Sequence, residues 1–126
     1  MRILITGGVG FIGTNVGEYF IQQGWEVIAL DNLVRTGVEE NAKYMQDTYK
    51  DKYQLVRGDI RCTEDFQRLP KKIDAIINLA ANPGIPWSIT NPIYDLHSNL
   101  NGAVNVLEYA RKIGACVIQA STNKVY

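Results

Sequence analysis

Three glycines near the start of the chain follow one another at intervals of three residues. Gly7, Gly10 and Gly13 come directly after the apolar run 3–5 and lead into a segment with helical periodicity. A glycine turn between a buried strand and a helix lets a pyrophosphate approach the backbone and the free N–H groups of the helix N-terminus. Gly7 would permit the tight turn, Gly10 the approach of the phosphates, and Gly13 the packing of helix on strand. The alternative is an ordinary glycine-rich turn without a ligand.

An acidic residue follows the next apolar run. Residues 25–30 read as a second strand, which ends at Asp31 and is followed by Asn32. A carboxylate at this point accepts hydrogen bonds from a ribose diol and repels a 2′-phosphate, so Asp31 predicts NAD rather than NADP. Arg35 weakens that choice, because a nearby arginine is how such folds accept the 2′-phosphate. The alternative is that Asp31 and Asn32 only stabilise a turn.

The third apolar run, 53–57, is followed by a polar and an apolar residue. Asp59 and Ile60 come after Gly58 at this position. Together they could contact the edge and the face of an adenine base. A plain connection from strand to helix is the alternative.

Two further runs end in small or hydroxyl-bearing residues. Residues 73–79 are nearly all apolar, as in a parallel strand covered on both faces, and Ala80 and Ala81 follow. Small side chains there would let a cofactor lie against the backbone. The last run, 115–120, is followed by Ser121 and Thr122 at the level expected for a nicotinamide.

Segments with helical periodicity separate these five apolar runs. The apolar side of the first predicted helix is expected to face the sheet. The alternation predicts an α/β fold, a Rossmann doubly wound parallel sheet with five strands, in one domain over residues 1–126. Residues 82–92 are rich in proline and predict an irregular loop or broken turn at the carboxyl end of the sheet. Thr63 is expected to cap a helix that ends before Pro70. The apolar positions of the helices are Ile12, Val16, Tyr19 and Phe20; Val38, Ala42, Met45 and Tyr49; and, over 94–112, Leu96, Leu100, Ala103, Val104, Leu107 and Ala110.

Composition narrows the classes of function. Thirteen Lys and Arg residues balance thirteen Asp and Glu residues, which gives no reason to expect nucleic acid or an anionic membrane as a partner. The start of the chain predicts neither a signal peptide nor a membrane span. Cys62 and Cys116 lack the spacing of a metal site, so no metal is expected, and Cys116 reads as a small core residue. Free thiols suit a reducing cytoplasm, which is the expected location.

Several separated segments together resemble the extended short-chain dehydrogenase/reductases, and within them the NAD-dependent nucleotide-sugar epimerase/dehydratase family. Asn78 stands where this family often has a histidine. The resemblance covers essentially the whole chain, in the right order and at the right intervals. The segments are TGGVGFIG at 6–13, Asp31-Asn32, Gly58-Asp59-Ile60, NLAA at 78–81, Asn99-x-Asn101-Gly102 and STNKVY at 121–126.

The resemblance implies an NAD cofactor, a nucleotide-sugar substrate and a homo-oligomeric enzyme. The stretch NPGIPWSI together with STNKVY favours a CDP-sugar. Thr122 matches the catalytic Ser/Thr, which hydrogen-bonds the substrate hydroxyl that is oxidised. The implied cofactor residues are Gly7, Gly10, Phe11 and Ile12 at the pyrophosphate, Asp31 and Asn32 at the ribose, Asp59 and Ile60 at the adenine, and Leu79, Ala80, Ala81 and Asn99 along the cofactor.

The family's general base is a Tyr with a Lys four residues later, and these 126 residues contain no such pair. Lys124 and Tyr126 have the wrong order and spacing, because residues two apart do not share a helical face. We therefore expect the chain to be the amino-terminal piece of a longer epimerase, inactive alone.

Two other functions remain open from the sequence. One is another epimerase or a dehydratase of the same family, although a dehydratase would carry acidic residues next to its catalytic Thr, where this chain has Asn123 and Lys124. The other is an NAD-binding module without catalysis. His97, the single histidine, reads as a helix-surface residue rather than a base, and Trp87 as either a substrate contact or a hydrophobic plug.

Overall fold

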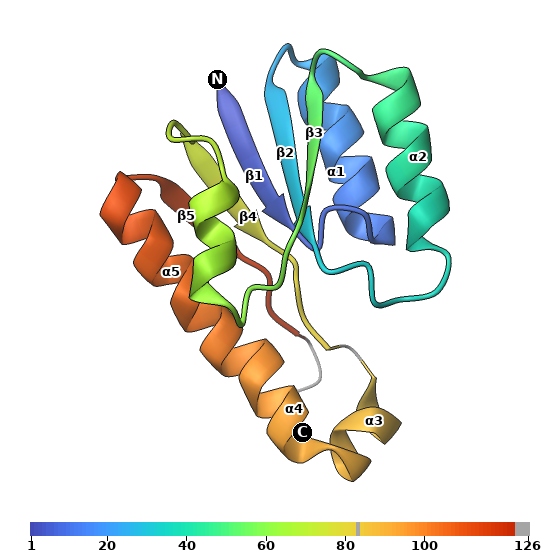
Figure 1. Cartoon of the computed structure of the whole chain (residues 1–126), viewed down its shortest axis with the longest axis vertical. Coiled ribbons are helices and arrows are strands. Elements are labelled where there is room, and N and C mark those ends of the chain that lie inside the picture. Colours follow the sequence, from blue (N-terminus) through green and yellow to red (C-terminus); the bar gives the residue numbers. More distant parts are fainter. Residues whose placement is uncertain (83, 123–126) are drawn as a thin grey trace.

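The computed structural model describes residues 1–82 and 84–122. Its parallel sheet has the strand order β3-β2-β1-β4-β5 (Figure 1). This order confirms the predicted doubly wound Rossmann sheet, and its switch point lies between β1 and β4, where such folds bind ligands. The strands are β1 (Arg2–Thr6), β2 (Glu26–Asp31), β3 (Tyr53–Arg57), β4 (Ala75–Asn78) and β5 (Cys116–Gln119).

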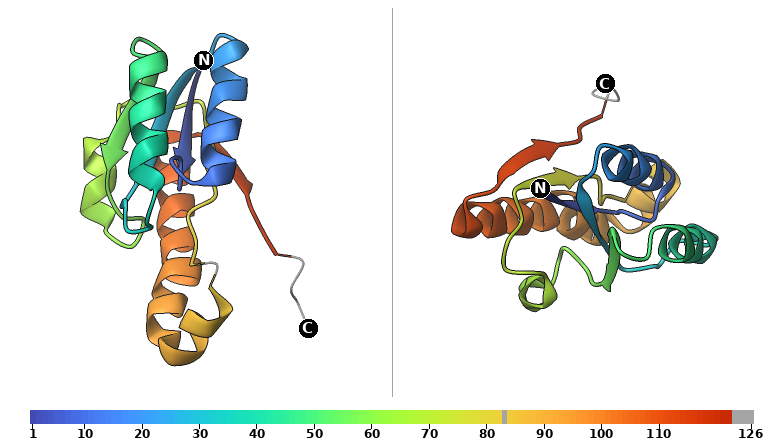
Figure 2. Two further views of the ribbon diagram at one scale, coloured as in Figure 1. Left: turned by 90° about the vertical axis from the view of Figure 1, so that its right-hand side faces the viewer. Right: turned by 90° about the horizontal axis from the view of Figure 1, so that it is seen from above.

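Helices cover both faces of the sheet (Figure 2). One face carries α1 (Phe11–Gln22) and α2 (Val38–Thr48), and the other carries the 3-10 helix η1 (Thr63–Arg68) and α5 (Gly102–Ile113). The short helices α3 (Ile85–Thr90) and α4 (Pro92–Leu96) lie beyond the carboxyl ends of the strands (Figure 1). The π-helical turn η2 (His97–Asn101) joins α4 to α5, so that the three run on as one helix.

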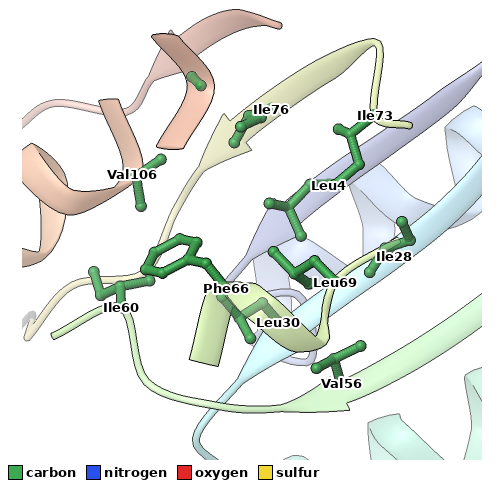
Figure 3. Close-up of a cluster of buried hydrophobic side chains, with 11 residues drawn as sticks. Leu4, Ile28, Leu30, Val56, Ile60, Phe66, Leu69, Ile73, Ile76 and Val106 are labelled. Carbon is green, nitrogen blue, oxygen red and sulfur yellow. The ribbon is translucent and has the colours of Figure 1, made fainter. Parts of the chain in front are cut away.

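Each strand sends alternate side chains into two cores, because successive residues of a strand point to opposite faces. Ile3 and Ile5 pack under α1 and α2, whereas Leu4 packs with Phe66 of η1 and Val106 of α5 (Figure 3). Central strands with both faces covered must be apolar throughout, which explains the continuous runs in the sequence.

The predicted elements differ from the observed ones mainly at their ends. The strands β4 and β5 are shorter than the runs 73–79 and 115–120. The segment expected to be an irregular loop contains the helix α3, so that prediction was wrong. Thr63 begins η1 rather than capping it, and no side chain caps this helix.

Several residues expected on buried faces are exposed. Ile12 and Tyr19 of α1 lie at the surface, and Cys116 is exposed rather than a core residue. Along α4, η2 and α5, the sheet-facing positions are Gly102, Val106 and Ala110, because apolar residues occupy more than one face of this helix and periodicity does not say which one packs. Four of the apolar positions predicted for the helix over 94–112 are exposed, namely Leu96, Leu100, Val104 and Leu107.

Candidate functional site

A cavity of about 280 Å³ lies at the carboxyl ends of β1, β2, β3 and β4. Strand order explains its position, since β1 and β4 diverge into connections on opposite faces of the sheet. Arg35, Arg61, Tyr94 and Ser98 complete much of its lining. The predicted cofactor residues that line it are Gly7, Gly10, Asp31, Asn32, Asp59, Ile60, Leu79, Ala80 and Ala81.

The glycine turn is built from close backbone contacts. Gly7 has a φ of +64°, and a Cβ there would lie 3.0 Å from the Ala80 nitrogen. A Cβ on Gly13 would lie 2.4 Å from the Gly7 carbonyl oxygen, so Gly13 lets the start of α1 pack closely on the glycine turn rather than on the strand itself. Sequence reasoning missed Gly8, where a Cβ would lie 2.6 Å from the Ala29 Cβ. Only the sequence TGGVG, with two adjacent glycines, could have signalled this second contact.

The N-terminus of α1 opens next to this turn. The helix begins at Phe11, so the N–H groups of its first turn have no partner within the helix. No acidic side chain lies in that turn to neutralise the positive end of the helix dipole. The side chains of Phe11 and Ile12 are 83% and 60% exposed and do not line the cavity. These two residues can therefore offer a ligand their backbone rather than their side chains.

Asp31 ends β2 at the cavity and accepts two backbone hydrogen bonds. Its Oδ1 accepts from the Leu33 N–H at 2.9 Å, and its Oδ2 accepts from the Val9 N–H at 3.3 Å. The turn stabilised by the first bond holds Leu33 at a φ of 58°, in the left-handed region. Asp31 therefore stabilises a turn, which was the alternative to ribose binding. It also lines the cavity. Arg35 lines the same cavity.

Asp59 occupies the end of the cavity formed by the loop after β3. Its carboxylate forms an ion pair with Arg61 at 2.7 Å and accepts a hydrogen bond from Asn32 Nδ2 at 3.0 Å. Burial favours a raised pKa for Asp59, but the hydrogen bonds from Arg61 and Asn32 outweigh it and lower the pKa to about 2. The carboxylate is thus ionised at neutral pH, and the connection after β3 is more than a plain turn.

Asn99 is the predicted cofactor residue that lies furthest from this arrangement. It is exposed on η2 and does not line the cavity. Its side chain binds the backbone of Asn82, accepting from the N–H at 2.7 Å and donating to the carbonyl oxygen at 3.2 Å. Asp95 holds both residues, since its Oδ1 accepts from Asn82 Nδ2 at 2.8 Å and from Asn99 Nδ2 at 3.0 Å. Asn99 is therefore linked to the cavity through Asn82, which lines it.

A chain of polar side chains, of which Thr6 and Asn78 are buried and Gln119 is exposed, ties the ends of three strands together. Thr6 Oγ1 donates to Asn78 Oδ1, and Asn78 Nδ2 donates to Gln119 Oε1 at 2.8 Å. Thr6 Oγ1 also accepts from the Ala80 N–H at 3.1 Å. Asn78, which replaces the histidine frequent in the resembled family, thus fixes where β4 and β5 leave the sheet.

The remaining candidates lie outside the cavity. Thr122 is exposed beyond the end of β5, and Lys124 and Tyr126 fall outside the described residues. His97 is exposed and its Nδ1 lies 2.9 Å from Asn101 Nδ2, as expected for a helix-surface residue. Trp87 is 51% exposed and meets the Tyr94 ring edge-on, so it is not a buried plug, and its contact with a substrate stays a prediction.

The residues present fit a dinucleotide with an unphosphorylated adenosine ribose. The glycine turn lets the backbone pass close beside the cavity, α1 begins next to it without a side-chain cap, and a carboxylate lies at the end of β2. Over residues 1–82 and 84–122 there is no cluster of three or more side chains that could hold a metal ion. The same residues contain no helix that is long and apolar enough to cross a membrane.

Comparison with known proteins agrees with this geometry. The chain is 38% identical over 130 residues to CDP-paratose 2-epimerase of Salmonella typhi, covering 100% of the chain and 38% of the relative. It is 34% identical over 128 residues to dTDP-glucose 4,6-dehydratase of Mycobacterium tuberculosis, again covering 100% of the chain and 38% of the relative. The crystal structure of UDP-glucose-4-epimerase from Stenotrophomonas maltophila with bound NAD superimposes with a TM-score of 0.88 at 26% identity, over 100% of this chain and 38% of that one.

The chain thus spans about 38% of the length of these two curated relatives. A family model described as "NAD dependent epimerase/dehydratase family" matches residues 3–126. The resemblance expected from the sequence and the NAD cofactor that it implied are therefore confirmed. The chain belongs to the NAD-dependent epimerase/dehydratase family.

Proposed function

We propose that residues 1–126 are the amino-terminal, NAD-binding part of a nucleotide-sugar epimerase that acts by transient oxidation of the sugar. The observation that carries this proposal is the convergence of the glycine turn, Asp31 and Asp59 on one cavity at the switch point of the sheet. Within the family, the similarity to CDP-paratose 2-epimerase favours that activity and a CDP-sugar substrate.

In this proposal the chain binds and orients, and NAD, when bound, supplies the hydride chemistry. Gly7, Gly10 and the N–H groups of Phe11 and Ile12 hold the pyrophosphate, because their backbone lines the open start of α1. Asp31 and Asn32 hold the ribose, and Asp59 and Ile60 hold the adenine. Leu79, Ala80 and Ala81 run along the cofactor, and Asn99 positions this segment through Asn82.

Thr122 is the catalytic residue of this part, and it would hydrogen-bond the substrate hydroxyl that loses its proton. We place the general base, a Tyr assisted by a Lys four residues later, beyond residue 126, together with most of the substrate pocket. Lys beside Tyr lowers the pKa of the phenol, which lets it accept the proton near neutral pH. The 126-residue chain would then bind NAD and have no epimerase activity by itself.

Two surface features support the proposed assembly and location. The exposed apolar residues of α5 favour a homo-oligomer of the whole enzyme. Cys62 and Cys116 are free thiols, which suits the cytoplasm.

The experiment is a titration of NAD into the protein produced from its whole reading frame, followed by an assay with CDP-sugars. We expect NAD to bind in a one-to-one ratio and a CDP-sugar to be epimerised without net consumption of NAD. A folded protein that binds no NAD would overturn the proposal.

The part of the same reading frame that follows Tyr126 distinguishes an epimerase from a non-catalytic module. A glycine after Tyr126 and a Tyr-x-x-x-Lys some tens of residues later would support the enzyme. A stop codon directly after Tyr126 would favour a module that binds NAD without catalysis.

A further inference from the structure

Arg61 is held on the Asp59 carboxylate by three hydrogen bonds. Its Nε donates to Oδ1 at 2.9 Å, its Nη2 to Oδ2 at 2.7 Å, and its backbone N–H to Oδ1 at 2.9 Å. Asn32 Nδ2 donates to Oδ2 as well. These four hydrogen bonds fix the place and the orientation of the Asp59 carboxylate, which lines the cavity.

The same guanidinium packs on an aromatic ring from another element. The Arg61 Cζ lies 4.4 Å from the centroid of the Tyr94 ring, on α4. The two hydrogen bonds from the guanidinium to Asp59 fix the plane of this group. The contact of Arg61 with Tyr94 therefore ties the loop after β3 to α4. A guanidinium over an aromatic face is attracted by the ring's quadrupole.

The backbone around Arg61 is fixed independently from α5. Asn105 Nδ2 donates to the carbonyl oxygens of Ile60 and Arg61, at 2.9 and 3.3 Å. Gly102 allows this approach, since a Cβ there would lie 2.5 Å from Ile60 Cδ1. Loss of the Arg61 side chain would therefore leave the loop backbone anchored, so its effect on binding can be measured apart from folding.

Arg61 and Tyr94 also separate two hollows of the surface. Both line the cavity that holds the predicted cofactor residues. Both line a second, more open groove on their other side, whose remaining walls are Cys62, Thr63, Ile93, His97, Asn101 and Asn105. The pair is thus a wall shared by the two hollows, and Arg61 joins it to Asp59.

We propose that the stacked pair of Arg61 and Tyr94 closes the adenine end of the NAD site, with Arg61 as a positioning residue that holds Asp59 and Asn32 in place for the adenosine. This inference rests on the proposed function, because it takes the cavity to be the NAD site. It predicts that the pair acts on the adenosine half of the cofactor and that the Tyr94 ring, not its hydroxyl, is what matters.

The test measures the dissociation constants of NAD and AMP for variants of the protein produced from its whole reading frame. Arg61→Gln and Tyr94→Leu should each raise both constants about tenfold, the loss expected for one well-made contact. Tyr94→Phe should bind like the wild type, because it keeps the ring. Arg111→Gln is the matched control, since it removes an arginine paired with Glu108 on the exposed side of α5.

The outcomes separate this inference from the proposed function. Wild-type protein that binds neither NAD nor AMP would overturn both. Wild-type protein that binds them, with Arg61→Gln or Tyr94→Leu equally tight, would overturn only the role of the pair, as would an equal loss in Tyr94→Phe and Tyr94→Leu. If Arg61→Gln does not fold, as judged by circular dichroism, the comparison of the two Tyr94 variants decides.

Discussion

At the scale of single residues, Asp31 combines two tasks that the sequence offered as alternatives. It stabilises the turn to Leu33 and presents its carboxylate to the cavity. An asparagine at this position keeps an oxygen that can accept from the Leu33 N–H but removes the negative charge. The charge can therefore be tested without loss of the turn.

We expect Asp31→Asn to lower the preference for NAD over NADP about tenfold, which is a change of about 1.4 kcal/mol in relative binding free energy. The physical reason is that the carboxylate repels a 2′-phosphate, while Arg35 in the same cavity can then pair with it. Titration of both cofactors measures the ratio of dissociation constants, with Asp47→Asn on the exposed surface of α2 as the control. An unchanged ratio would mean that Asp31 is only a turn residue.

Asp59 predicts a dependence of stability on pH. Its pKa in the folded protein is lowered from 3.8 to about 2, because the hydrogen bonds from Arg61 and Asn32 outweigh burial. The stabilisation is therefore complete above the unfolded value near pH 4 and is lost as the pH falls towards 2. Denaturant unfolding at pH 5, 4, 3 and 2 should show the free-energy difference between the wild type and Asp59→Asn shrinking as the pH falls. A constant difference over that range, as expected for the Asp47→Asn control, would contradict this assignment.

Much of the site could be predicted from residue types at the ends of strands. Parallel strands bring their carboxyl ends to one edge of the sheet. The residues that follow the first four predicted strands were therefore expected to meet there, among them Gly7, Asp31 and Asp59. The roles of Arg61 and Gly8 were not predicted from the sequence, because they depend on contacts with Tyr94 and Ala29 that no local sequence pattern indicates. Asn99 shows the converse, since resemblance placed it at the cofactor, whereas its side chain forms hydrogen bonds with Asn82 and Asp95 and does not line the cavity.

At the scale of elements, the sequence predicted which segments form strands and helices better than which helical faces are buried. Strand runs in a covered parallel sheet are apolar on both sides and stand out from their surroundings. The helix from α4 to α5 carries apolar residues on two faces, so periodicity alone could not select Val106 as the buried position. The helix α3 was missed because its sequence holds a proline, which the first turn of a helix tolerates.

The polar chain across β1, β4 and β5 gives a prediction about element packing. Asn78→Leu should reduce the free energy of unfolding by about 2 kcal/mol, because it leaves the buried Thr6 hydroxyl without the acceptor of its proton. Denaturant unfolding of wild type and variant measures this loss.

The matched control replaces both buried partners. Thr6→Val combined with Asn78→Leu should cost clearly less than the sum of the two single changes, since no unpaired hydroxyl then remains at Thr6. Additive losses would show that the chain from Thr6 to Asn78 does not act as a unit.

At the scale of the whole molecule, residues 1–126 leave apolar surface uncovered. Leu96, Leu100, Val104 and Leu107 are 46–55% exposed along one helix, and Ile118 of the edge strand β5 is 62% exposed. Exposed apolar patches and open sheet edges promote association. We therefore expect the isolated 126-residue chain to be marginally stable and prone to aggregate.

A double substitution on the exposed helix tests this expectation. Leu100→Lys with Leu107→Lys should keep the 126-residue chain monomeric at concentrations about tenfold higher, because it breaks the apolar patch without removing a core contact. Light scattering measures association, and Glu108→Lys, an exposed polar position on the same helix, is the control. Equal aggregation of the two variants, or cooperative melting of the unaltered chain at an ordinary mesophilic temperature, would contradict the expectation.

Hydrogen–deuterium exchange with and without NAD, on the protein produced from its whole reading frame, tests most directly whether the switch-point cavity holds the cofactor. We predict that bound NAD slows exchange at the amides of 7–13, 31–33 and 59–61, while the exchange of α2 residues 39–48 stays unchanged. These three segments come together only at the carboxyl ends of β1, β2 and β3. Unaltered exchange in all three at saturating NAD, or slowing confined to other segments, would show that the cofactor does not bind there.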